Sequence, residues 1–162
     1  MGGATREAED AGIRVVHLRL GIVLSPAGGA LGKLLPVFRV GLGGKLGNGR
    51  QWMSWITLDD TVNAILHAVG DESTSPALAL RGPVNVCSPE PVTNSEFTST
   101  LGKVLRRPAL LPVPAFALRL GLGQMADEAL LSSARVLPSK LMESGFSFKD
   151  PSLEAALHKL LR

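Results

Sequence analysis

Apolar and polar positions change period along the chain, and these changes predict an α/β protein. Arg14–Leu20 and Pro83–Cys87 are runs of β-branched and apolar residues, as expected for two largely buried strands. Ala4–Ala11 is polar and compatible with a helix, and Gly12 supplies its end. A helix followed at once by a buried strand is typical of the layered sheet of an α/β fold.

Helical spacing predicts further elements in the first half of the chain. The leucines and the phenylalanine of Ala30–Val40 fall on one helical face. Trp52–Ile56 is typical of a short strand, after which Asp59 or Asp60 should cap a helix across Val62–Val69. This order repeats the alternation of helix and strand.

The second half of the chain is predicted to be mainly helical. Thr93 and Glu96 form the pattern of a capping box at the start of a helix that runs to about Leu105. Asp150 is expected to cap the terminal helix, with Pro151 in its first turn. The remaining expected elements are a strand at Leu110–Val113, helices at Ala115–Leu120, Gln124–Ser132, Pro138–Ser144 and Leu153–Leu161, and an extended stretch at Phe146–Phe148.

Composition favours one globular unit that handles small ligands. The 162 residues, 45% of them apolar, are enough to bury one core. A net charge of +3 favours anionic ligands, but the sequence lacks the basic stripe of a nucleic-acid-binding protein. Cys87 is the single cysteine and cannot form an internal disulfide, so we expect a reducing, cytoplasmic setting. The charged first twelve residues do not resemble a secretory signal or a membrane anchor.

Sequence patterns for several chemistries are absent or incomplete. The glycine loop Gly41–Gly49 follows a predicted helix and leads into a strand, whereas a dinucleotide fingerprint needs a strand, a turn and then a helix. His17, His67 and His158 have no other ligands at metal-binding spacing, so we expect no metal site. A hydrolase would need a nucleophile elbow or a motif around Cys87, and neither is found.

The densest group of functional residue types surrounds two tryptophans. Arg50, Gln51, Trp52, Ser54 and Trp55 stand beside the glycine loop. An arginine, an amide and an indole in such a place can grip a phosphate and stack on a ring. The alternative is that both tryptophans belong to the core, and this is the reading we favour for Trp55. The group predicts the mouth of a ligand site.

Several strings together resemble the extended short-chain dehydrogenases/reductases. Arg19–Pro26 is similar to their strand-exit motif Arg-x-Gly-Asn-Val-Tyr-Gly-Pro, and Trp55–Asp60 is similar to Phe-Ile-His-Val-Asp-Asp. Gly82–Val86 resembles their later Gly-x-x-Tyr-Asn-Val strand. A closer resemblance is to the sugar-nucleotide-epimerase-like proteins with a small C-terminal domain of unknown function, and its strings are Gly28–Lys33, Gly41–Gly49, Gln51–Ile56, Leu137-Pro138 and Gly145-Phe146.

This resemblance implies a fold. Residues 1–162 would form a single compact unit, the C-terminal part of a Rossmann-like parallel sheet with a small α/β cap on the substrate side. Residues 1–88 would end the Rossmann-like domain and carry an inserted substrate loop, and residues 89–162 would form a mainly helical cap. The strands at 14–20 and 83–87 would then lie side by side and parallel.

The resemblance also implies a site. NADP or NAD would be approached by the backbone of Gly21, Ile22, Val23 and Leu24. The anionic substrate would contact Leu34, Phe38, Gly43, Gly44, Arg50, Gln51, Trp52, Ser54 and Trp55. Two positions depart from the pattern, since Ile22 replaces an asparagine of many relatives and Thr57 a histidine of the closer group.

The catalytic residues of the resembled family are missing from this chain. It contains no tyrosine, and therefore no Tyr-x-x-x-Lys pair, and it has no glycine fingerprint for the cofactor phosphates. We therefore expect this chain to be the substrate-side portion of an NAD(P)-dependent epimerase or oxidoreductase. Alone it should be inactive, without a catalytic residue of its own, and should bind the cofactor weakly or not at all. The alternative is a non-catalytic interaction module that pairs through an exposed sheet edge beside Arg14–Leu20.

Overall fold

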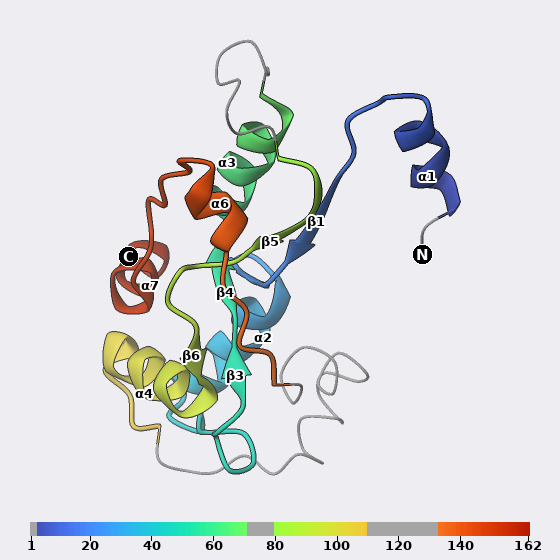
Figure 1. Cartoon of the computed structure of the whole chain (residues 1–162). Coiled ribbons are helices and arrows are strands. Elements are labelled where there is room, and N and C mark those ends of the chain that lie inside the picture. Colours follow the sequence, from blue (N-terminus) through green and yellow to red (C-terminus); the bar gives the residue numbers. More distant parts are fainter. Residues whose placement is uncertain (1–2, 71–79, 110–132) are drawn as a thin grey trace.

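The computed structural model describes residues 3–70, 80–109 and 133–162, and it shows an α/β arrangement (Figure 1). The strand expected at 110–113 and the helices expected at 115–120 and 124–132 lie outside the described residues. The elements in chain order are α1 (Gly3–Asp10), β1 (Val16–Leu20), β2 (Ile22–Leu24), α2 (Gly29–Arg39), β3 (Trp52–Met53), β4 (Trp55–Thr57), α3 (Leu58–Val69), β5 (Gly82–Val86), β6 (Val92–Thr93), α4 (Asn94–Leu105), α6 (Ser139–Glu143) and α7 (Leu153–Leu160).

The strand pair β1 and β5 forms the parallel centre of the fold. The register runs from Val16 opposite Gly82 to Leu20 opposite Val86. The prediction of two adjacent parallel strands is therefore confirmed, although they are far apart in sequence. A connection between parallel strands must cross back along the sheet, and here the crossover contains α2 and α3.

Gly21 passes the chain from this pair to a second one. Its backbone N–H donates to the carbonyl of Val86 at 2.9 Å, and the next N–H, that of Ile22, donates to Ser54 at 2.8 Å. The strand β2 then pairs in parallel with β4, and β3 pairs antiparallel with β6. The short strand expected at 52–56 is thus two strands that pair with different partners, and Ser54 lies between them.

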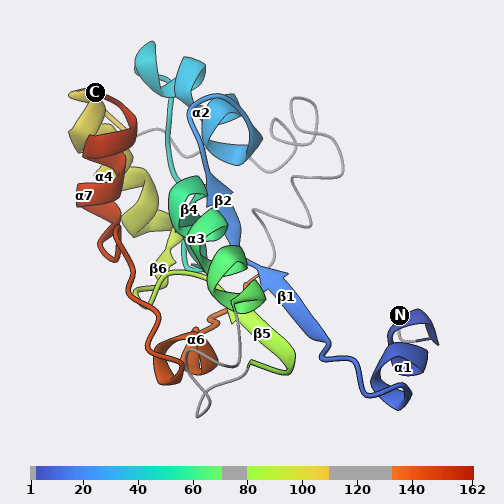
Figure 2. The ribbon, with the colours of Figure 1, turned by 90° about the horizontal axis from the view of Figure 1, so that it is seen from above.

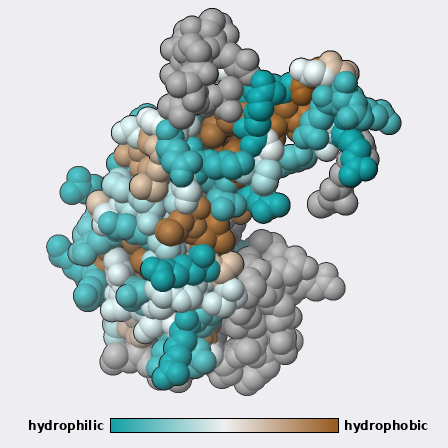
Figure 3. All heavy atoms as spheres, in the orientation of Figure 1, coloured by the Kyte–Doolittle hydropathy of each residue, from teal (hydrophilic) through white to brown (hydrophobic). Residues whose placement is uncertain are grey.

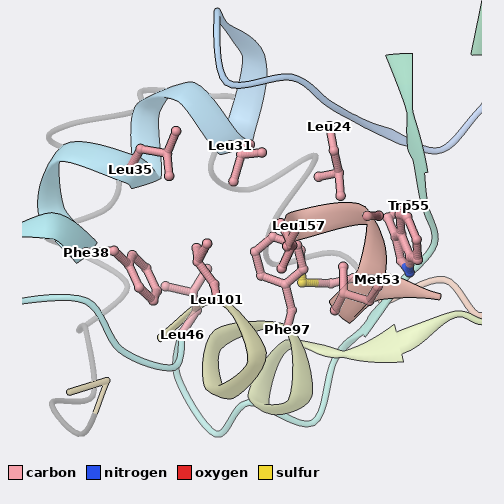
Figure 4. Packing of buried hydrophobic residues seen from close by; sticks show 12 residues of the cluster. Leu24, Leu31, Leu35, Phe38, Leu46, Met53, Trp55, Phe97, Leu101 and Leu157 are labelled. Atoms are coloured by element: carbon pink, nitrogen blue, oxygen red, sulfur yellow. The ribbon is translucent and has the colours of Figure 1, made fainter. Parts of the chain in front are cut away.

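A hydrophobic core joins the crossover helix to the C-terminal helices. In Figure 4, Phe38 of α2 faces Leu101 of α4, and Phe97 lies beside Leu157 of α7. These side chains are at most 2% exposed, and burying each one stabilises the fold by about 1.5–3 kcal/mol. Trp55 is fully buried at the edge of the same cluster, and its indole N–H donates to the carbonyl of Glu90 at 2.9 Å.

The helix α3 begins differently from the sequence expectation. Neither Asp59 nor Asp60 caps it, because Thr57 is the N-cap and its hydroxyl accepts from the N–H of Asp60 at 3.2 Å. The carboxylate of Asp60 is fully buried and instead accepts from the backbone N–H groups of Lys149 and Asp150, at 3.0 and 2.9 Å. A residue expected to act locally therefore fixes a segment of the C-terminal region.

The other two expected caps have opposite outcomes. The capping box of α4 is confirmed, since the hydroxyl of Thr93 accepts from the N–H of Glu96 and the carboxylate of Glu96 accepts from the N–H of Thr93. Asp150 does not cap α7, because the N-cap is Ser152. The Asp150 carboxylate instead accepts from the Thr57 hydroxyl and from Lys159.

The N-terminal end of the structure stands away from the rest. Both views place α1 apart from the body, with the chain returning along β1 (Figures 1 and 2). Hydrophobic side chains also reach the surface, as the brown areas of Figure 3 show. They include a row on α3, where Val62, Leu66 and Val69 are 48%, 64% and 72% exposed. Within the described ranges, every helix falls short of the length and hydrophobicity needed to cross a membrane.

Candidate ligand cleft

A cleft of about 630 Å³ opens at the carboxyl ends of β1 and β5. Its lining residues come from four parts of the sequence, within residues 19–30, 52–54, 85–87 and 134–136. Ligands of open α/β sheets bind at this edge of parallel strands. The position of the cleft therefore follows from the direction of the two strands.

Close packing shapes the wall that β1 and β2 supply. A Cβ atom on Gly21 would come within 2.6 Å of the Ser54 carbonyl oxygen and 3.2 Å of the Cys87 Cβ. Only glycine therefore lets β1 and β2 join beside these residues. The half-buried side chains of Ile22 and Val23 continue the wall, whereas Leu24 is fully buried in the core. The structure thus brings three of the four residues predicted to bind cofactor to the cleft.

A C-terminal segment that is bonded to Ser54 forms another part of the lining. The Ser54 hydroxyl donates to the carbonyl of Ala134 at 2.7 Å and accepts from the N–H of Val136 at 2.9 Å. The backbone N–H of Trp52 donates to the Ser133 hydroxyl at 3.1 Å. Sequence reasoning assigned Ser54 to substrate, but its side chain is 8% exposed and already bonded to protein.

Trp52 lines the cleft with an arginine stacked on it. The guanidinium carbon of Arg135 lies 4.7 Å from the centre of the Trp52 ring. A stacked guanidinium keeps its N–H groups at the edges, where they can donate to an anion. Sequence analysis missed Arg135, because nothing in the local sequence links it to a tryptophan more than eighty positions earlier.

Asn85 and Cys87 at the end of β5 were also missed. The Asn85 amide donates to the Leu137 carbonyl at 3.3 Å, and the Cys87 thiol donates to the Val136 carbonyl at 3.4 Å. Burial raises the pKa of Cys87 to about 11, because the thiolate would lose its hydration. A raised pKa leaves little thiolate at neutral pH, and this lowers the nucleophilic reactivity of the group. An alternation of strand residues could have placed both side chains at the sheet edge.

The remaining predicted substrate residues lie away from the cleft. Arg50 and Gln51 line a neighbouring hollow of about 420 Å³ with Ser133, and the Gln51 amide donates to the Leu46 carbonyl at 3.1 Å. Phe38 is 2% exposed and its ring packs on Gly43, where a Cβ would lie 2.5 Å from the ring. The others are in or against the core, namely Leu34, Gly44 and Trp55.

The lining of the cleft suits binding better than proton transfer. Among the described residues that line it, the polar side chains are Arg19, Trp52, Ser54, Asn85 and Cys87, and none is a carboxylate, histidine or lysine. The first turn of α2 also reaches it, through Gly29 and Ala30. The free N–H groups of a helix start favour an anion.

Comparison with known proteins shows that the chain is similar to epimerase family proteins. The model of a domain of unknown function (DUF1731) matches residues 113–160. The epimerase family protein Mb2239 of Mycobacterium bovis is 47% identical over 154 residues, which are 95% of this chain and 49% of that protein. The chain therefore spans about half the length of the curated relatives it matches.

Solved structures show the same fold. The crystal structure of the human epimerase family protein SDR39U1 (isoform 2) with NADPH has a TM-score of 0.81 and 34% identity, covering 91% of this chain and 48% of that one. The nucleoside-diphosphate sugar epimerase of Corynebacterium glutamicum has a TM-score of 0.67 and 32% identity, covering 97% of this chain and 28% of that one. The predicted Rossmann-like α/β class is confirmed.

Proposed function

We infer that this chain, which belongs to the epimerase family, forms the substrate-side part of an NAD(P)-dependent epimerase or oxidoreductase. The observation that carries the proposal is the cleft at the carboxyl edge of β1 and β5, walled by Gly21, Ile22 and Val23. The substrate is an anion of the nucleotide-sugar type. The names of two similar proteins support this choice, since one was solved with NADPH and the other is a nucleoside-diphosphate sugar epimerase.

The cleft fits the ring end of a dinucleotide. Its lining combines the apolar residues Leu20, Ile22 and Val23 with the small residues Ala30 and Ala134, a composition that suits a slot for a flat ring. Among the described residues that line the cleft, no glycine fingerprint cradles a pyrophosphate. Bound NAD(P) would supply hydride transfer. This chain would orient the nicotinamide, while another segment holds the phosphates.

The proposed substrate contacts are made by arginines in and beside the cleft. Arg135, held on Trp52, donates to a phosphate or carboxylate of the substrate, and Arg19 adds a second positive charge. Arg50 and Gln51 act from the neighbouring hollow. The same proposal divides the chain at residue 88, where the Rossmann-like part ends and the cap begins. It also places the protein in a reducing cellular compartment, in which the buried thiol of Cys87 stays free.

A nuclear magnetic resonance titration tests the assignment of the cleft. The ¹⁵N-labelled chain is titrated with nicotinamide mononucleotide, which carries the ring, and with adenosine monophosphate, which does not. We expect weak binding that shifts the amides of Gly21, Ile22 and Val23 for the first ligand and leaves them unchanged for the second. Ala134→Arg should abolish these shifts by filling the slot, whereas the matched control Ala155→Arg, on the exposed face of α7, should not.

Two outcomes would contradict the proposal. Shifts that are equal for the two mononucleotides, or that persist in Ala134→Arg, would remove the ring site from the cleft. Tight NADPH binding together with turnover by this chain alone would show that it needs no other segment for catalysis.

A second candidate function is pairing through the free edge of β1. On one side β1 pairs with β5, and no other strand of the described residues pairs with its second edge. The exposed apolar row of α3 is the specific observation that favours a partner surface. Light scattering over a concentration series tests this self-pairing. A monomer at every concentration rejects self-pairing, and a stable dimer supports it.

A further inference from the structure

A second hollow, of about 590 Å³, lies along α4 and shares no residue with the cleft. Its four charged lining residues are all cations. We name it the basic groove and define it by six of its residues, Lys45, Ser95, Thr98, Lys103, Arg106 and Arg107.

One face of α4 forms the floor of the basic groove. Ser95, Thr98, Ser99 and Gly102 share one helical face, because each lies three residues from one of the others and four from another. The core residues Phe97 and Leu101 occupy another face of the same helix. The distance along the axis from the first serine to the end of the helix is roughly 15 Å at 1.5 Å per residue. The floor is therefore polar and elongated.

The turn after α4 places two arginines at one end of this floor. Arg106 adopts a left-handed conformation, with φ of 54°, and the N–H of Arg107 donates back to the Gly102 carbonyl at 2.9 Å. A Cβ on Gly102 would come within 2.8 Å of the Ala109 Cβ, so the returning chain lies directly on the helix. Lys45 of the glycine loop lines the groove from a separate segment.

The positive charge of the groove has no compensating partner in the described part of the chain. None of its lining residues is acidic, and no ion pair involves Lys45, Lys103, Arg106 or Arg107. The sequence contains no Asp or Glu between positions 96 and 127. The carboxylate of Glu96 is committed to the capping box, where it accepts from Thr93 at 2.7 and 2.8 Å.

A buried hydroxyl lines the same groove. Thr98 is 4% exposed, and across residues 3–70, 80–109 and 133–162 no side-chain hydrogen bond satisfies its hydroxyl. Every fully buried side-chain polar atom of the described residues has a partner, so this hydroxyl keeps contact with the open groove. A donor in this position, close to cations, suits an anion with several acceptor oxygens.

Stabilisation of the helix end is the simpler explanation for some of these cations. Cations near a helix C-terminus interact favourably with its partial negative charge. Two of the last four carbonyls of α4, however, are already bonded, since Gly102 and Lys103 accept from the backbone N–H of Arg106. Helix stabilisation also gives no role to Lys45, which belongs to no helix.

We propose that the basic groove binds a small anion that carries a diphosphate group. Cations from two segments and a floor longer than one phosphate match two linked phosphates better than one. Lys103, Arg106 and Arg107 contact the phosphate oxygens, Thr98 donates its hydroxyl, and Lys45 closes the side. This site does not depend on the function proposed for the cleft.

Titration with inorganic pyrophosphate tests the proposal on the whole 162-residue chain. We expect saturable binding with amide shifts at Ser95, Thr98 and Lys103, and weaker binding of inorganic phosphate. The double variant Lys103→Gln, Arg107→Gln should weaken pyrophosphate binding about tenfold, because contacts of exposed charges are screened by water and each contributes less than a buried one. The matched control Lys149→Gln, Arg162→Gln removes the same charge elsewhere and should leave affinity within about twofold.

A further variant guards against misfolding. Arg106→Asn removes a cation at a left-handed position that asparagine tolerates, so the fold should persist while binding weakens. Absence of saturable binding, equal weakening in the two double variants, or shifts confined to Gly21 and Val23 of the cleft would each overturn the proposal. Stronger binding of single-stranded RNA than of pyrophosphate would also overturn it, in favour of a nucleic-acid surface.

Discussion

Replacement of Asp60 tests how the C-terminal region is attached to the parallel strands. The carboxylate is fully buried and accepts two backbone hydrogen bonds, from Lys149 at 3.0 Å and from Asp150 at 2.9 Å. Hydrogen bonds to a charged group contribute about 1.5–3 kcal/mol each, and each buried donor left unpaired costs about 1–3 kcal/mol. Asp60→Ala should therefore lower the free energy of unfolding by about 3–5 kcal/mol. This is a large part of the stability of a domain.

Two further variants separate hydrogen bonding from other effects. Asp60→Asn keeps one acceptor and turns an N–H₂ group toward the other donor, so it should lose about half of that free energy. Asp59→Ala is the neighbouring control, because Asp59 is exposed and pairs only with the flexible Lys159 among the described residues. Urea unfolding followed by circular dichroism gives the midpoints. The reasoning is refuted if Asp60→Ala and Asp59→Ala have the same midpoint.

Three further predictions concern the cleft and the start of α4. Gly21→Ala should destabilise the fold by about 1–3 kcal/mol, measured by thermal unfolding, because its Cβ would meet the Ser54 carbonyl at 2.6 Å. Burial raises the pKa of Cys87 to about 11, so its alkylation should be slow at pH 8 and should still increase with pH above pH 9, where alkylation of an ordinary thiol levels off. Since folding favours the thiol, stability is complete below about pH 9 and should decline as pH rises toward 11; unchanged unfolding midpoints from pH 8 to 10.5 would contradict this. Hydrogen bonds from the backbone N–H and the hydroxyl of Thr93 lower the pKa of Glu96, so the stability of the capping box should be present above the normal carboxyl pKa and be lost as pH falls. Thr93→Ala removes the hydroxyl but keeps the N–H, so it should reduce that shift in a carbon NMR titration.

The local sequence determined the elements whose cause is local. The capping box of Thr93 and Glu96 is a contact between residues three positions apart, so the pattern predicted it correctly. The parallel pairing of β1 and β5 was also predicted, through apolar runs and through the family resemblance. The same resemblance placed Gly21, Ile22 and Val23 at the end of a strand, where the cleft lies.

Residues with alternative partners were assigned wrongly. Asp60 and Asp150 both stand at helix starts, where a carboxylate normally caps its own helix. In the fold they bind distant groups instead, because the C-terminal segment comes within 3 Å of α3. The sequence alone does not give the distance between segments far apart in the chain. The pattern therefore predicted that each carboxylate caps its own helix.

The cleft itself separates what the sequence determined from what tertiary structure decided. Residue types near Trp52 indicated a ligand mouth, and that knowledge came from the sequence alone. Which side chains face it was decided by packing, since Phe38 and Trp55 found partners in the core while Arg135 came from more than eighty positions away. Periodicity determines which face of an element is apolar, but the contacts between faces depend on how all elements fill the space between them.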